Sequence, residues 1–106
     1  MNLVNCTPHP LTLIRTDGSR LILPKGEIVP RLTQSTVDIG SIDGIRLTET
    51  VFGETTNLPE PQDNTVYIVS RLVLSANPYR QDLAVPNDLV RDENGQIIGC
   101  ESLAMV

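Results

Sequence analysis

Glycine, proline and Asx residues interrupt this 106-residue sequence so often that short strands fit it better than long helices. Runs rich in Val, Ile, Leu and Thr lie between the interruptions, for example at 11–15, 20–23, 45–52 and 65–69. Short runs of this composition, bounded by turn signals, are typical of β-strands. The sequence therefore predicts a single α+β, mostly β domain over residues 1–106, built as a small antiparallel sheet or partial barrel.

Three turn signals are specific enough to place hairpins. Asp17-Gly18 and Asp43-Gly44 each predict a tight turn, because glycine adopts a positive φ without steric cost. Asp92-Glu93-Asn94-Gly95 predicts a four-residue loop between the last two strands. These last strands are expected within 89–91 and 96–100, after a short strand at 83–85.

Other segments are less regular. Residues 28–33 predict a strand that is bulged or at a sheet edge, because Pro30 has no amide hydrogen to donate. The polar segment 34–44 contains two glycines and predicts a loop or an irregular edge. Residues 53–64 contain two prolines and predict a connection, which could include a short extended piece at 54–57.

One short helix is expected at about residues 70–77. Apolar side chains there recur with the helical spacing i, i+3, i+4, i+7, at Val69, Leu72, Val73 and Ala76. Ser70 is a suitable N-cap because its hydroxyl oxygen can accept from a free amide of the first turn. Asn77-Pro78 is a suitable stop, since a residue before proline avoids the helical region. The run before this helix, 65–69, predicts a central strand.

Composition excludes several classes of function. The net charge is −5 and only Phe52, Tyr67 and Tyr79 are aromatic, so extensive nucleic-acid binding is disfavoured, although residues 1–36 carry a net charge of +2 that could form a modest basic patch. No apolar run approaches the ~20 residues that span a bilayer, and the N-terminus does not resemble a secretory signal. A cytoplasmic protein with no membrane partner is expected.

Two cysteines lie near opposite ends, at Cys6 and Cys100. In a reducing compartment we expect them to be free, buried thiols, although the sequence leaves open whether they are paired. Cys6, His9 and Cys100 could contribute to a zinc site, but a structural site needs four ligands and a second ligand pair is missing. No metal or cofactor is predicted.

The first candidate site is the segment 5–10, which places the only histidine between two prolines. A stiff loop could present His9 as a base or hydrogen-bond donor, flanked by the polar side chains of Asn5 and Thr7. The alternative is structural: Asn5 and Thr7 bond to the nearby backbone, and His9 is a surface residue.

The second candidate site follows the predicted helix. Arg80 and Arg91 could clamp a phosphate or carboxylate, with Asp82 orienting one guanidinium. The alternative is an Arg–Asp ion pair that fixes an irregular loop beside the core.

Catalytic motifs are absent. The sequence has no G-x-S-x-G elbow and no phosphate-binding glycine loop. Ser70 or Ser75 could form a triad with His9 and Asp82. Because most small proteins contain at least one serine, histidine and aspartate, this set is weak evidence for a hydrolase. A small enzyme using His9 with Asp82 or Cys100 stays an alternative.

Several motifs together resemble a family of small proteins of unknown function from bacteria, phages and prophages. The motifs are Val4-Asn5-Cys6-Thr7-Pro8-His9, Val66-Tyr67-Ile68-Val69-Ser70, Arg80-x-Asp82 and Val90-Arg91-Asp92-x-x-Gly95-x-Ile97-x-Gly99-Cys100. The resemblance covers nearly the whole chain except residues 34–56. It implies an accessory role in a phage-related setting and no particular activity. Small accessory proteins in such settings often occupy a host protein or sequester a small nucleotide signal.

These observations favour a non-enzymatic binding protein that takes a phosphate-bearing small molecule or a protein partner. The ligand-binding residues predicted for it are Asn5, Thr7, His9, Arg80, Asp82 and Arg91. A structural or assembly component is a further alternative. Exposed strand edges could also support a homo-oligomer.

Overall fold

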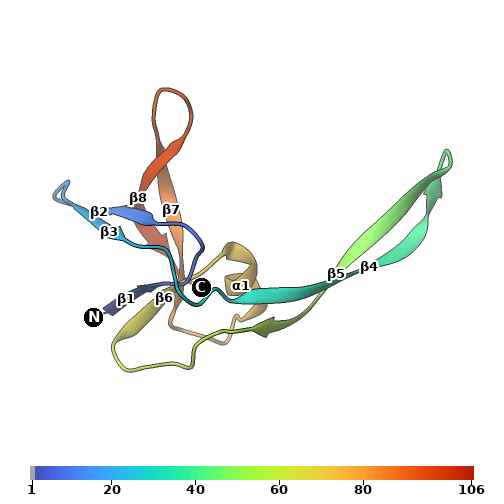
Figure 1. Cartoon of the computed structure of the whole chain (residues 1–106), viewed down its shortest axis with the longest axis horizontal. Helices are drawn as coiled ribbons and strands as arrows, with labels where there is room; N and C mark the ends of the chain where they lie inside the picture. Colours follow the sequence, from blue (N-terminus) through green and yellow to red (C-terminus); the bar gives the residue numbers. More distant parts are fainter. Residues whose placement is uncertain (1) are drawn as a thin grey trace.

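A computed structural model describes residues 2–106, which form a curved sheet, one short helix and a long hairpin arm (Figure 1). Six strands make the sheet, ordered β1 (Asn2–Asn5), β6 (Thr65–Ile68), β7 (Leu83–Arg91), β8 (Ile97–Ala104), β2 (Leu11–Ile14) and β3 (Arg20–Leu23). The arm consists of β4 (Arg31–Ile42) and β5 (Ile45–Thr56), and the helix is α1 (Arg71–Ala76). The prediction of an α+β, mostly β fold is confirmed.

The sheet is mixed and curls into a partial barrel. The pairs β1–β6, β6–β7 and β2–β8 are parallel, whereas β2–β3 and β7–β8 are antiparallel. Its curvature brings the chain leaving β3 against the end of β1. Gly26 N donates to the Thr7 carbonyl oxygen at 2.8 Å, and Asn5 Nδ2 donates to the Pro24 carbonyl oxygen at 2.9 Å. These bonds join the two edges of the sheet at one end.

Gly26 is required for this closure. A Cβ at this position would collide with the carbonyl oxygen of Asn5, which is backbone and cannot move aside cheaply. Gly26→Ala is therefore expected to lower the free energy of unfolding by about 1–3 kcal/mol, measured by urea denaturation. The neighbouring exposed residue supplies the control, since Lys25→Ala should change it by no more than about 0.5 kcal/mol. A Gly26→Ala variant as stable as the wild type would refute the close approach.

The core lies on both faces of the sheet. Toward α1, one cluster joins Cys6, Tyr67, Val69, Val73, Leu74, Leu83 and Val85. Inside the curl, a second cluster joins Leu13, Ile68 and Cys100, with five partly buried leucines packed on it. Successive residues of a strand point to opposite faces, so Tyr67 and Ile68 supply one cluster each. The prediction of a central strand at 65–69 is confirmed, because β6 lies between β1 and β7.

Local predictions hold at the helix and the turns. The Ser70 Oγ accepts from Val73 N at 3.3 Å at the N-terminus of α1, and Asn77 caps its C-terminus. Asp43 and Gly44 have φ values of 53° and 80°, the combination that a two-residue hairpin turn of type I′ requires. The loops at Gly18 and Gly95 also place glycine at positive φ.

Of the two alternatives predicted for residues 34–44, the loop is wrong and the irregular edge is confirmed, because β4 belongs to a two-stranded ribbon and its register shifts near Ile39. These residues belong to β4, which pairs with β5 along nearly its whole length and has irregularities near Thr33 and Ile39. Water surrounds both faces of the arm, so a polar composition is compatible with a strand there. For the same reason β5 continues beyond Phe52 to Thr56, and this continuation contains most of the extended piece expected at 54–57.

Two further strand boundaries differ from those predicted. The strand expected at 28–33 begins only at Arg31, after the buried Pro30. The pieces expected at 83–85 and 89–91 are one strand, β7, which passes through Pro86. Pairing with β6 ends at Ala84, and Pro86 pairs with Leu103 of β8. The missing amide hydrogen of Pro86 therefore costs no hydrogen bond to β6. Among residues 2–106, no helix is long and apolar enough to cross a membrane.

Candidate functional site

A hollow of about 710 Å³ lies between the edge strands β1 and β3. Most of the residues that line it are apolar: Leu3, Val4, Cys6, Leu23, Pro24, Gly26, Ile28, Pro59 and Tyr67. The polar and charged residues of the lining are Asn5, Lys25, Glu27 and Gln62. Sites for small molecules have volumes of about 300–1,000 Å³ and are apolar with a few polar groups. We refer to this surface as the β1–β3 hollow.

Asn5 fixes one wall of the β1–β3 hollow. Its side-chain nitrogen donates to the carbonyl oxygens of His9 at 2.8 Å and Pro24 at 2.9 Å. Its side-chain oxygen accepts from Thr7 N at 2.9 Å and Thr7 Oγ1 at 2.7 Å. The amide thus uses both donors and accepts twice. These bonds agree with the structural role given above as the alternative to ligand binding. Asn5 and Thr7 hold the loop in shape and do not offer free groups to a ligand.

His9 is exposed, and in the part of the chain described here its imidazole makes no hydrogen bond. Cys100 is buried inside the curl, where burial raises the pKa of its thiol. Asp82 directs both carboxylate oxygens to Arg80. The enzymatic alternative requires His9 to act with Asp82 or Cys100. Within residues 2–106, no hydrogen bond joins the His9 side chain to either of them.

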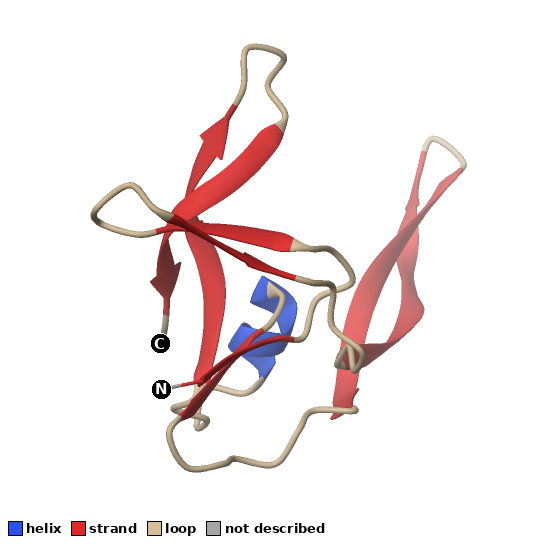
Figure 2. Cartoon of the chain, turned by 60° about the vertical axis from the view of Figure 1, so that its left-hand side comes forward, coloured by secondary structure: helices blue, strands red, loops and turns tan. Residues whose placement is uncertain are grey.

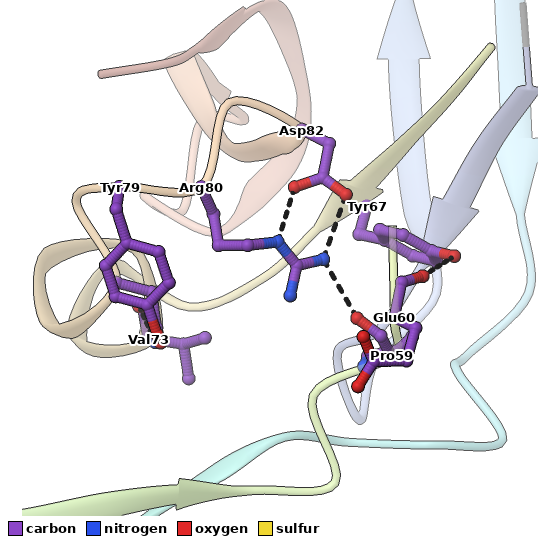
Figure 3. Close-up of polar contacts among 8 residues, drawn as sticks. Pro59, Glu60, Tyr67, Val73, Tyr79, Arg80 and Asp82 are labelled. Carbon is purple, nitrogen blue, oxygen red and sulfur yellow. Dashed lines mark hydrogen bonds and ion pairs between the residues drawn. The ribbon is translucent and has the colours of Figure 1, made fainter. Parts of the chain in front are cut away.

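Arg80 and Asp82 form the ion pair given above as the alternative to a ligand clamp (Figure 3). Arg80 Nε donates to Asp82 Oδ1 at 2.8 Å and Nη2 donates to Oδ2 at 2.9 Å. The same Nη2 donates to the Pro59 carbonyl oxygen at 2.8 Å. The two side chains are 12% and 17% exposed. Hydrogen bonds from Arg80 hold the pKa of Asp82 below its ordinary value.

This ion pair helps to build the hollow from behind. Pro59 and Tyr67 both line the hollow, and the Tyr67 hydroxyl donates to the Glu60 carbonyl oxygen at 3.0 Å. Arg80 and Tyr67 therefore pin the connection 57–64 against the sheet from two points (Figure 3). Their role is to position a wall of the β1–β3 hollow.

Arg91 lies away from the other predicted site residues. It ends β7 and donates from Nη1 to the Gly95 carbonyl oxygen at 2.8 Å, within the β7–β8 hairpin. Arg80 and Asp82 precede the opposite end of this nine-residue strand, which spans about 30 Å (Figure 1). The structure therefore brings Asn5, Thr7 and His9 together and pairs Arg80 with Asp82, but it leaves Arg91 outside both groups.

Sequence reasoning missed Lys25 and Gln62, which line the hollow. Lys25 is the only lysine of the chain, is exposed, and forms no ion pair among residues 2–106. Its sole sequence signal was a Pro-Lys-Gly turn, and the contact of that turn with β1 joins residues far apart in the chain.

The cysteines fit a structural role. Cys6 and Cys100 are unbonded, buried and in separate core clusters, and burial raises the pKa of both thiols. In residues 2–106, no three His, Cys, Asp or Glu side chains gather where they could hold a metal ion.

No protein-family model matches this chain, and neither curated proteins nor solved structures give a significant match to it.

Proposed function

We propose that this protein is a non-enzymatic binding protein that receives a phosphate-bearing small molecule in the β1–β3 hollow. The observation that supports the proposal is the combination, on one concave surface, of a mostly apolar lining and the Lys25 ammonium group, which forms no ion pair within residues 2–106 although the Glu27 carboxylate also lines the hollow.

The lining suggests how such a ligand would sit. Leu3, Val4 and Ile28 offer aliphatic surface for an uncharged ring. Lys25 is the only cationic side chain of the lining, so the phosphate belongs beside it. Gln62 adds amide donors and an acceptor on the same surface.

Arg80 is a weaker candidate for the phosphate contact. Its guanidinium already binds a carboxylate through two nitrogens, and a ligand would have to compete with Asp82. We therefore place the phosphate beside Lys25 and not between Arg80 and Arg91, where the sequence predicted it.

Matched ligand pairs test this proposal. Thermal unfolding is followed with nucleosides and with the corresponding mono-, di- and cyclic nucleotides. A bound nucleotide at 100 times its Kd should stabilise the fold by about 2.7 kcal/mol, whereas its nucleoside should stabilise it much less.

Lys25→Gln is expected to weaken nucleotide binding about 10–100-fold by titration calorimetry, because it removes one charge-assisted hydrogen bond. Arg20→Gln is the control, since Arg20 is an exposed cation on β3 that does not line the hollow. Failure of every nucleotide to stabilise a folded sample, or equal weakening by both substitutions, would reject the proposal.

A further inference from the structure

The β1–β3 hollow runs along an edge of β1 and not over one of its faces. Its lining includes Leu3, Val4, Asn5 and Cys6, which follow one another in the chain. Successive side chains of a strand point to opposite faces. Leu3 packs on the cluster inside the curl, whereas Cys6 belongs to the cluster toward α1. Side chains from both faces border the hollow, so the backbone edge between them faces it as well.

The strand β1, which begins at the N label in Figure 2, is a terminal strand of the sheet and pairs only with β6. At its end, Cys6 N donates to the Ile68 carbonyl oxygen at 2.9 Å. In a strand, the residues that bond to one neighbour alternate with residues whose N–H and C=O point to the opposite edge. Leu3 and Asn5 therefore direct their N–H and C=O groups away from β6.

The loop after β3 covers the part of this edge that follows Leu3. Gly26 N donates to the Thr7 carbonyl oxygen at 2.8 Å, and a Cβ on Gly26 would collide with the Asn5 carbonyl oxygen. Within residues 2–106, no turn or loop bonds to the backbone of Leu3. The free groups are therefore, in chain order, the Leu3 N–H, the Leu3 C=O and the Asn5 N–H. A peptide that extends a sheet bonds along several residues of its edge, so this short run suits a small ligand better.

We propose that this edge of β1 binds the base of the nucleotide and that the base is uracil. The inference rests on the function proposed above and names the base that the same site prefers. Proteins distinguish bases by hydrogen bonds to their Watson–Crick edges. Uracil presents C=O, N–H and C=O along this edge, which complements the N–H, C=O and N–H of Leu3 and Asn5. Cytosine presents an amino group, a bare ring nitrogen and C=O, so in either orientation two of its groups would face groups of the same kind.

The position of Lys25 is compatible with this arrangement. Asn5 Nδ2 donates to the Pro24 carbonyl oxygen at 2.9 Å, and Lys25 is the next residue of the chain. Leu3 precedes Asn5 by two residues, which is about 7 Å along a strand. The free edge and the ammonium group therefore lie along one side of the same hollow, where a mononucleotide can contact the first with its base and the second with its phosphate.

Titration calorimetry of the full chain with matched ligands tests the inference. Uridine and cytidine 5′-monophosphate share their sugar and phosphate and differ only at ring positions 3 and 4. The uridine nucleotide should bind at least about 10-fold more tightly, because the cytidine nucleotide leaves main-chain groups of β1 unpaired. Uridine 5′-monophosphate methylated at N3 lacks the ring N–H and should also bind at least about 10-fold more weakly than its parent.

A pair of variants at one position tests the main-chain contact. Leu3→Pro removes an amide hydrogen that faces the hollow and no bond to β6, so it should reduce the preference for uridine over cytidine nucleotide about 3–10-fold. Leu3→Ala is the control, since it shortens the same side chain but keeps the amide, and it should retain the preference. Equal affinities of the wild type for the uridine and cytidine nucleotides, or for the uridine nucleotide and its N3-methyl derivative, would overturn the inference and leave the proposed nucleotide site standing. Absence of binding by every nucleotide would reject both.

Discussion

Replacing Ile68 with alanine is expected to lower the free energy of unfolding by about 4 kcal/mol. Ile68 is completely buried inside the curl of the sheet, where it packs with Leu13 and Cys100. Truncation removes buried methyl and methylene groups and leaves a cavity, because strands fixed on several sides cannot collapse into it. Urea denaturation measures the loss, which is a large part of the ~5–15 kcal/mol typical of a domain.

The same substitution at an exposed site is the control. Ile22 lies on edge strand β3 and is 67% exposed, so Ile22→Ala should cost no more than about 0.5 kcal/mol. Equal losses at the two positions would mean that the interior of the curl is not a packed core.

Asp82→Asn is expected to lower the free energy of unfolding at neutral pH by about 3 kcal/mol. The substitution leaves the Arg80 guanidinium nearly buried without its counter-charge, and it weakens the attachment of the connection 57–64 at Pro59. Asp38→Asn is the control, because the Arg46–Asp38 pair is 75% and 65% exposed and such pairs contribute about 0–1 kcal/mol. A loss no larger than that of the control would show that the Arg80–Asp82 pair is not a structural clamp.

The stability difference between the wild type and Asp82→Asn should depend on pH. Hydrogen bonds from Arg80 lower the pKa of Asp82 in the folded protein from an ordinary value of 3.8. A carboxylate with a lowered folded pKa stabilises the fold above its unfolded pKa, and this contribution is lost as the pH falls through the folded value. Denaturation at a series of pH values should therefore show the difference constant above about pH 5 and shrinking in more acidic solution. A difference that grows on acidification would contradict this assignment.

Local chemistry explains the parts of the fold that were predicted correctly. The Asp43-Gly44 turn and the Ser70 cap of α1 depend on backbone angles and hydrogen bonds within a few residues. The doubly buried strand β6 was visible as a continuous apolar run. For Asn5 with Thr7 and for Arg80 with Asp82, the sequence left a binding role and a structural role open, and the hydrogen bonds support the structural one.

The strand at 45–52 and the Asp43-Gly44 turn of the arm were predicted, but the loop alternative for residues 34–44 was wrong because the stability of β4 does not follow from its own pattern. Residues 34–44 are polar and contain Gly40, so they do not alternate as a half-buried strand does. Their partner is β5, and the ladder between the two strands became evident only when both were seen paired.

The sequence by itself determined the mostly β class, the hairpin turns and the single capped helix, because each depends on residues adjacent in the chain. Only the tertiary structure decided that Gly26 closes on β1, that Lys25 faces a hollow and that Arg91 lies at the far end of β7. These arrangements follow from how the sheet curls, and that curvature is set by packing between strands distant in the sequence.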